Sequence, residues 1–131
     1  MIAVDTNILV RLLTGDEPDQ ARRARAIFES GAVLLAKTVV LETEWVLRRL
    51  YALERSAVLD ALAAAIALPN VRCEDFGAVV DALGWAKAGM DFADALHLAS
   101  AQQARRFATF DESMAKRAAK IAGIPVFVPA R

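Results

Sequence analysis

The sequence predicts an α/β fold with a parallel sheet that helices cover on both faces. Segments of strand length alternate with segments of helical periodicity along the 131 residues, a pattern typical of parallel strands joined through helices. The strand-length segments are almost entirely apolar, as expected for strands buried on both faces. No repeat, low-complexity tract or linker interrupts the chain, so we expect one domain spanning residues 1–131.

The elements of the N-terminal half follow from apolar spacing and from the residues that start and stop helices. Strands are expected at residues 2–4 and 32–36, which are short apolar runs. The sequence Asp-Glu-Pro at residues 16–18 is typical of a helix start. Gly31 and the Pro-Asn pair at residues 69–70 are helix stops. Between these signals the sequence predicts helices at residues 8–13, 16–30, 39–51 and 55–68.

The C-terminal half continues the alternation with shorter strands. A helix at residues 76–88 is expected to end at Gly89, a residue type favoured at helix C-caps. An alanine-rich stretch predicts a long helix at residues 91–106. Asp111 is expected to begin a helix that runs to about residue 122. Strands are expected at residues 71–73, 107–110 and 126–128.

Composition excludes several classes of protein. A hydrophobic content of 56% argues against disorder. Sixteen basic and sixteen acidic residues give no net charge, which disfavours a protein that coats nucleic acid non-specifically but allows an enzyme that contacts a few phosphates. No apolar run reaches the roughly 20 residues of a membrane span, and no signal peptide is visible. With Cys73 as the only cysteine, we expect a reduced, cytoplasmic setting.

A carboxylate directly follows the first predicted strand. Asp5 ends the apolar run and precedes Thr6, Asn7 and the first predicted helix. Open α/β sheets bind their ligands at the carboxyl ends of the strands. Because Asp, Thr and Asn are also common helix N-caps, a capping role is the favoured explanation for Asp5 taken alone, and a catalytic role is the alternative.

Two glutamates of the helix at residues 39–51 are expected in different surroundings. Glu44 lies four residues before Arg48, the spacing of an ordinary exposed ion pair. Apolar residues lie three positions before Glu42 and three and four positions after it, at Val39, Trp45 and Val46, which places Glu42 on the apolar face of the helix. An unpaired carboxylate is costly there. We therefore expect Glu42 either to pair with a cation such as Arg49 or to bind a metal ion.

Three further aspartates fall at predicted helix starts. Asp91 and Asp94 are three residues apart, and a capping arrangement explains Asp91 better than Asp94. Asp111 follows the strand at residues 107–110 as Asp5 follows the first strand, and parallel strands would bring both to one edge of a sheet. Converging carboxylates without a basic partner raise one another's pKa. A hard divalent cation such as Mg²⁺ or Mn²⁺ relieves that repulsion, although an N-cap role explains Asp111 equally well.

Other common chemistries are disfavoured. His97 is the only histidine, so a zinc site of the usual kind is not expected and we assign His97 a structural or supporting role. Cys73 has no nearby histidine or second cysteine and is a poor candidate for a nucleophile. The sequence has no glycine-rich phosphate-binding loop.

Four segments carry these acids in a recognisable order and spacing, at residues 2–9, 39–47, 91–99 and 108–111. Together they resemble the PIN-domain family and, within it, the VapC-type toxins of bacterial toxin–antitoxin pairs. The likeness covers essentially the whole chain. Each segment alone is weak, but the four in order are quite specific.

The resemblance implies an α/β/α sandwich around a central parallel sheet and a site for Mg²⁺ or Mn²⁺. The metal ligands and catalytic acids that it implies are Asp5, Glu42, Asp94 and Asp111. Asp91 would lie beside that site, and the polar positions that would orient the carboxylates or the attacking water are Thr6, Asn7 and Thr109.

The function that the resemblance implies is metal-dependent hydrolysis of RNA phosphodiester bonds by a toxin that a cognate antitoxin inhibits, with a homodimer as the expected assembly. One alternative is a phosphatase-like hydrolase with Asp5 as nucleophile, weakened because no second aspartate follows two residues later. Another is a non-catalytic protein-binding module whose acids are only helix caps. Neither alternative is excluded by the residues alone.

Two further features concern partners. The helix at residues 56–68 is apolar nearly all round, so we expect it to be buried or covered by a partner such as the antitoxin. Several arginines are candidates for contacts with RNA phosphates, although most are expected to be solvated: Arg11, Arg22, Arg23, Arg25, Arg48 and Arg49.

Overall fold

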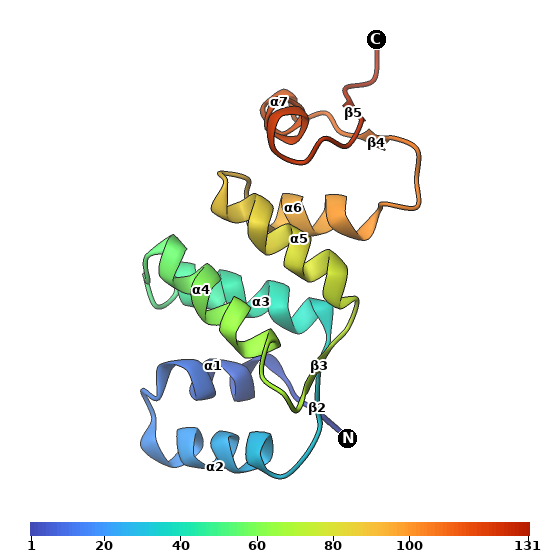
Figure 1. Cartoon of the computed structure of the whole chain (residues 1–131). Coiled ribbons are helices and arrows are strands. Elements are labelled where there is room, and N and C mark those ends of the chain that lie inside the picture. Colours follow the sequence, from blue (N-terminus) through green and yellow to red (C-terminus); the bar gives the residue numbers. More distant parts are fainter. The chain divides into compact units, whose positions relative to one another are not determined.

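The computed structural model describes residues 1–131 and confirms the α/β class with parallel strands. The chain has seven α-helices and five β-strands in the order that the sequence predicts, with two helices after each of the first three strands (Figure 1). The chain packs as two compact units, residues 1–76 and residues 77–131. No helix combines the length and the apolar character that crossing a membrane would require.

The first unit is built on a three-stranded parallel sheet. The strand order is β1-β2-β3, with Ile2 opposite Val33 and Leu34 opposite Arg72. Figure 1 shows α1 lying against α2, and α3 lying beside α4. The strands are β1 (Ile2–Ala3), β2 (Val33–Leu35) and β3 (Val71–Cys73), and the helices are α1 (Thr6–Thr14), α2 (Pro18–Glu29), α3 (Lys37–Arg49) and α4 (Arg55–Ile66).

Local sequence explains where the helices of the first unit begin and end. Glu17 caps α2 by accepting hydrogen bonds from the second and third backbone N–H groups, and Pro18 occupies the first position of the helix. Glu54 caps α4 in the same way. Gly15 ends α1 with φ +64°, a left-handed conformation that glycine adopts without steric cost. The predicted starts and stops are therefore close to the observed ones.

Helix α4 has a buried side and an exposed side of small residues. Val58, Leu59 and Leu62 are buried, whereas Ala63 and Ala64 are exposed. The apolar character that the sequence shows all round this helix therefore comes partly from alanines, which remain on the surface at little cost.

The second unit combines three helices with a two-stranded parallel sheet. Phe107 pairs with Val126, and Ala108 pairs with Phe127. Its helices are α5 (Phe76–Lys87), α6 (Phe92–Ser100) and α7 (Glu112–Ile121), and its strands are β4 (Phe107–Ala108) and β5 (Val126–Phe127).

Two elements of the second unit are shorter than the sequence predicts. The helix expected at residues 91–106 ends at Ser100. Residues 102–106 are exposed, so their helical propensity is not supported by burial of an apolar face. The strand expected at residues 107–110 pairs only through Phe107 and Ala108. Phe110 is 84% exposed, so apolar character at that position does not indicate a buried strand.

Candidate functional site

Asp5 caps helix α1. Its backbone is extended, with φ −83° and ψ 166°, and its Oδ1 atom accepts a hydrogen bond of 2.8 Å from the Thr6 N–H. Because this bond engages one carboxylate oxygen and the residue is exposed, the other oxygen can face a ligand. The capping role expected for Asp5 is thus compatible with a second role.

Glu42 of α3 lies at the start of α1. The Thr6 hydroxyl donates a hydrogen bond of 2.5 Å to Glu42 Oε1 across 36 residues of sequence. Thr6 is buried, whereas Glu42 is exposed. In the first unit, the structure therefore brings Glu42 to the residue next to Asp5. Thr6, one of the polar residues predicted to orient the carboxylates or the attacking water, thus contacts the carboxylate of Glu42.

The predicted pair between Glu44 and Arg48 is confirmed, but the predicted burial of Glu42 and exposure of Glu44 were wrong. Glu44 is only 3% exposed, and its Oε2 atom accepts a hydrogen bond of 2.7 Å from Arg48 Nε. Glu42 is exposed, and Trp45 on the same side is 48% exposed. The face of α3 that packs inward is shifted by one to two residues, to Val40, Thr43, Glu44 and Leu47. Both faces carry apolar residues at helical spacing, so periodicity could not separate them.

Three aspartates of the second unit gather around a small cavity. Asp91 caps α6 by accepting a 3.1 Å hydrogen bond from the Asp94 N–H, and Asp111 caps α7 by accepting one of 2.9 Å from the Met114 N–H. Thr109 accepts a 3.0 Å hydrogen bond from the Asp111 N–H, so it helps to fix the backbone at that residue. The cavity holds about 40 Å³, and the side chains around it are Met90, Asp91, Asp94, Asp111, Ser113, Met114 and Arg117.

The surroundings of Asp94 disfavour its negative charge. Burial raises the pKa of the Asp94 carboxyl above its ordinary value, and the charges of Asp91 and Asp111 raise it further. His97 and Arg117 act in the opposite direction on the same pKa, and their effects are smaller. Repulsion among aspartates, which the sequence predicts, therefore acts on Asp94, but burial has the larger effect on its pKa.

The predicted metal ligands are all carboxylates, and this donor set fits a hard divalent cation. The structure shows no ready-made group of three or more acidic, histidine or cysteine side chains that could hold an ion. Within the first unit, the candidate ligands are Asp5 and Glu42. Within the second unit, they are Asp94 and Asp111, while Asp91 lies beside them.

The remaining sequence candidates have other roles. His97 is exposed and its charge lowers the pKa of Asp94 slightly, and its supporting role stays a prediction. Burial, together with the charges of Glu74 and Asp75, raises the pKa of the Cys73 thiol to about 11. Cys73 is therefore a neutral thiol at physiological pH and an unsuitable nucleophile.

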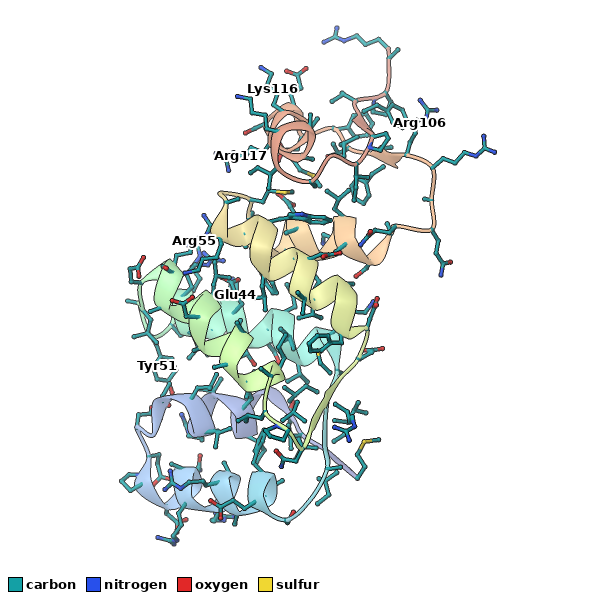
Figure 2. The ribbon with its side chains drawn as sticks, viewed as in Figure 1. Glu44, Tyr51, Arg55, Arg106, Lys116 and Arg117 are labelled. Carbon is teal, nitrogen blue, oxygen red and sulfur yellow. The ribbon has the colours of Figure 1, made fainter.

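The sequence did not predict the two polar residues, besides the three aspartates, that line the cavity of the second unit. Ser113 and Arg117 lie four residues apart on α7, the helix that Asp111 caps. Arg117 is exposed and follows Lys116 on the same helix, as Figure 2 shows. The available signal was their four-residue spacing, which places both on one face of the helix whose N-cap is the candidate ligand Asp111.

Most of the candidate arginines have partners within the protein. Arg11 binds Asp16, Gln20 and Tyr51. Arg48 pairs with Glu44. Arg22 and Arg23 both pair with Asp19 and are both largely exposed.

Comparisons with known proteins give one family. The family model of the PIN domain matches residues 2–120. Among solved structures, the chain is similar to the Mycobacterium tuberculosis toxin VapC20, described as cleaving the sarcin–ricin loop. The identity is 24%, the TM-score is 0.44, and the match covers 95% of this chain and 96% of that one. A search of curated proteins found no match.

Proposed function

This chain belongs to the PIN domain family, and from that premise we propose that it is a metal-dependent endoribonuclease of the VapC toxin type. The proposal assigns Asp5, Glu42, Asp94 and Asp111 to one site for Mg²⁺ or Mn²⁺. It is supported by the order and spacing of these four acids in the sequence and by what surrounds them in each unit.

The observation that carries the proposal is the hydrogen bond from Thr6 to Glu42. It holds a glutamate of α3 beside the N-terminus of α1, where Asp5 is the N-cap. Glu42 is exposed and its contact is a neutral hydroxyl, so its charge is not neutralised by that partner. A surface carboxylate held in place by a buried threonine is suited to binding rather than to stabilising the fold.

The residues of this chain would divide the work of hydrolysis. A bound Mg²⁺ or Mn²⁺ would lower the pKa of the attacking water and stabilise negative charge on the scissile phosphate and the leaving oxygen. Thr6 fixes the Glu42 carboxylate, and Thr109 holds the backbone at Asp111. Arg117, beside Asp94 and Asp111, offers a guanidinium group to a phosphate oxygen.

The biological setting is proposed from the resemblance of the four acidic segments to VapC-type toxins. In that setting the substrate is RNA, a cognate antitoxin binds and inhibits the protein, and the active form is a cytoplasmic homodimer. The exposed face of α4 and the apolar cavity lined by Leu13, Leu47 and Leu53 offer surface to such protein partners.

The test is cleavage of a panel of folded RNAs by antitoxin-free protein in Mg²⁺ or Mn²⁺, with and without a chelator. Asp5→Asn is the informative variant, because asparagine caps a helix about as well as aspartate but carries no charge. Glu54→Gln is its matched control, since Glu54 caps α4 and is not a proposed ligand. We expect the chelator and Asp5→Asn to abolish cleavage and Glu54→Gln to leave it unchanged.

Cleavage that persists in the chelator would contradict metal dependence. Cleavage by Asp5→Asn at the wild-type rate would remove Asp5 from the site. Turnover of phosphomonoesters without any cleavage of RNA would favour a phosphatase-like activity instead.

A further inference from the structure

The first unit contains a second cavity next to the proposed catalytic residues. It lies between α1 and α2 and holds about 300 Å³, the lower end of the range for small-molecule sites in proteins. Its lining residues are Asn7, Ile8, Arg11, Gln20, Arg23 and Ile27. Asn7 directly follows Thr6, whose hydroxyl donates a hydrogen bond to Glu42. The cavity therefore begins at the residue after the one that holds this carboxylate.

The lining combines apolar walls with hydrogen-bond donors and positive charge. Ile8 of α1 and Ile27 of α2 are both half-buried and contribute apolar surface. Asn7 and Gln20 carry amide groups, which donate and accept hydrogen bonds. Two arginines, Arg11 and Arg23, line the cavity, and the aspartates that pair with them lie outside its lining. A ligand that matches it has a flat apolar part, a polar edge and a negative charge.

Arg11 is held in a fixed position at this cavity. Its Nε atom donates to Gln20 Oε1 over 2.8 Å, and its Nη1 atom donates to Tyr51 Oη over 2.6 Å and to Asp16 Oδ1 over 3.2 Å. The Tyr51 hydroxyl in turn donates to Asp16 Oδ2 over 2.7 Å; Tyr51 is labelled in Figure 2. These bonds use Nε and Nη1 and leave Nη2 for a ligand. Such positioning lowers the entropy cost of binding an anion.

We propose that this cavity binds one unpaired nucleotide of the RNA, with the base between Ile8 and Ile27 and a phosphate at Arg11 and Arg23. A nucleobase has an apolar face and a polar edge, and an adjoining phosphate supplies the negative charge. A base can enter such a cavity only when it is not paired in a duplex. The inference rests on the proposed ribonuclease function and specifies the substrate as RNA with an unpaired nucleotide next to the cleaved bond.

The chain provides a closely matched pair of variants. Arg22 and Arg23 are adjacent on α2, both pair with Asp19, and their side chains are 70% and 71% exposed. Only Arg23 lines the cavity. Arg23→Gln and Arg22→Gln therefore make the same change in charge and remove the same kind of ion pair. A second pair is Ile27→Glu, which places a carboxylate in the cavity wall, and Ala26→Glu, which places one on the exposed side of α2.

The experiment is a titration of the full chain, in buffer with EDTA, with each of the four ribonucleoside 5′-monophosphates. Binding is monitored through the NMR chemical shifts of the backbone amides. Inorganic phosphate is titrated in parallel. We expect a mononucleotide to shift the amides of residues 7, 8, 11, 20, 23 and 27. Arg23→Gln should weaken binding about five- to tenfold, in line with the loss of one charge-assisted contact, and Ile27→Glu should abolish it. Arg22→Gln and Ala26→Glu should change the affinity by less than about twofold.

Three results would overturn the inference. The first is the absence of shifts at these residues with any mononucleotide. The second is an equal response to inorganic phosphate, which would indicate an anion site without a base pocket. The third is equal weakening by Arg22→Gln and Arg23→Gln, which would indicate non-specific attraction between charges.

RNA cleavage assays on the same variants separate this inference from the proposed function. If both hold, Arg23→Gln raises KM for RNA more than Arg22→Gln does, without lowering kcat. Cleavage by wild type with no mononucleotide binding would contradict the cavity and leave the ribonuclease intact. Mononucleotide binding by a wild-type protein that cleaves no RNA would contradict the ribonuclease and leave the nucleotide site intact.

Discussion

In the first unit, the Glu42 carboxylate lies on the surface and accepts a hydrogen bond from Thr6, whereas in the second unit Asp94 is half-buried and faces two further aspartates. The first arrangement fixes the position of a carboxylate by an uncharged contact. The second raises the pKa of the carboxyl by burial and by repulsion from Asp91 and Asp111. A bound divalent cation would change the position of the Glu42 carboxylate little, because Thr6 already holds it. In the second unit it would relieve the repulsion between Asp94 and the other two aspartates.

The largest expected effect distinguishes the two aspartates at the start of α6. Asp94→Asn removes a proposed ligand, so we expect RNA cleavage to fall at least about 100-fold, a loss of several kcal/mol of transition-state stabilisation. Asp91→Asn keeps the helix cap and removes only a neighbouring charge, so we expect a fall of no more than about tenfold. Initial rates in saturating Mn²⁺ measure both. Equal losses in the two variants would contradict the separate roles.

The next effect is a difference in folding stability between variants of the two glutamates of α3. Glu44 is buried and paired with Arg48, so Glu44→Gln should lower the free energy of unfolding by about 1–2 kcal/mol. Glu42→Gln retains a carbonyl oxygen that accepts the hydrogen bond from the Thr6 hydroxyl. It should therefore change the free energy of unfolding by less than about 0.5 kcal/mol. Urea unfolding of the two variants checks this, and activity should show the reverse order. A larger loss of stability from Glu42→Gln would contradict the burial seen here.

A smaller effect concerns Arg117, the cationic side chain beside Asp94 in the second unit. The charge of Arg117 partly offsets the raised pKa of Asp94, so it competes with a metal ion for the same carboxylates. Arg117→Gln should therefore tighten Mn²⁺ binding about two- to fivefold. Lys116→Gln, one residue earlier on α7 (Figure 2), is the control and should leave the affinity unchanged. Weaker Mn²⁺ binding in Arg117→Gln would show that this arginine supports the site rather than competing in it.

The smallest effect is on the pH dependence of stability. Because the pKa of Asp94 is raised in the folded chain, the folded state holds that proton more tightly than the unfolded state does. The Asp94 carboxyl therefore opposes folding increasingly as the pH rises from its ordinary pKa through the raised one. In metal-free buffer at pH 7, Asp94→Asn should raise Tm by about 1–3 °C, and the gain should shrink toward pH 4. A gain that is independent of pH, or a loss of stability at pH 7, would contradict this.

The sequence predicted the class of fold and most element positions, because those depend on local signals. The Asp-Glu-Pro start of α2 and Gly31, the predicted stop just after this helix, are visible in the sequence and lie close to the helix ends in the structure. The end of α6 was not predictable in this way. It depends on the absence of packing after Ser100, which a run of good helix-forming residues does not reveal.

For the candidate site, the sequence supplied the residue types but not all of their surroundings. The caps at Asp5, Asp91 and Asp111 followed from their positions at helix starts. The burial of Glu44 in place of Glu42 did not, because apolar residues occupy both faces of α3 and only packing selects one. The position of Arg117 also depends on how α7 packs within the second unit, which local pattern does not specify.

The most direct test of the central proposal is a double-mutant cycle on Mn²⁺ affinity, measured by electron paramagnetic resonance on wild type, Asp5→Asn, Asp94→Asn and the double variant. If both carboxylates bind the same ion, each single variant loses most of the affinity and the double variant loses little more. If each unit binds an ion of its own, each single variant loses one of two sites and the double variant loses both. The proposal predicts the first result, and independent losses at two sites would contradict it.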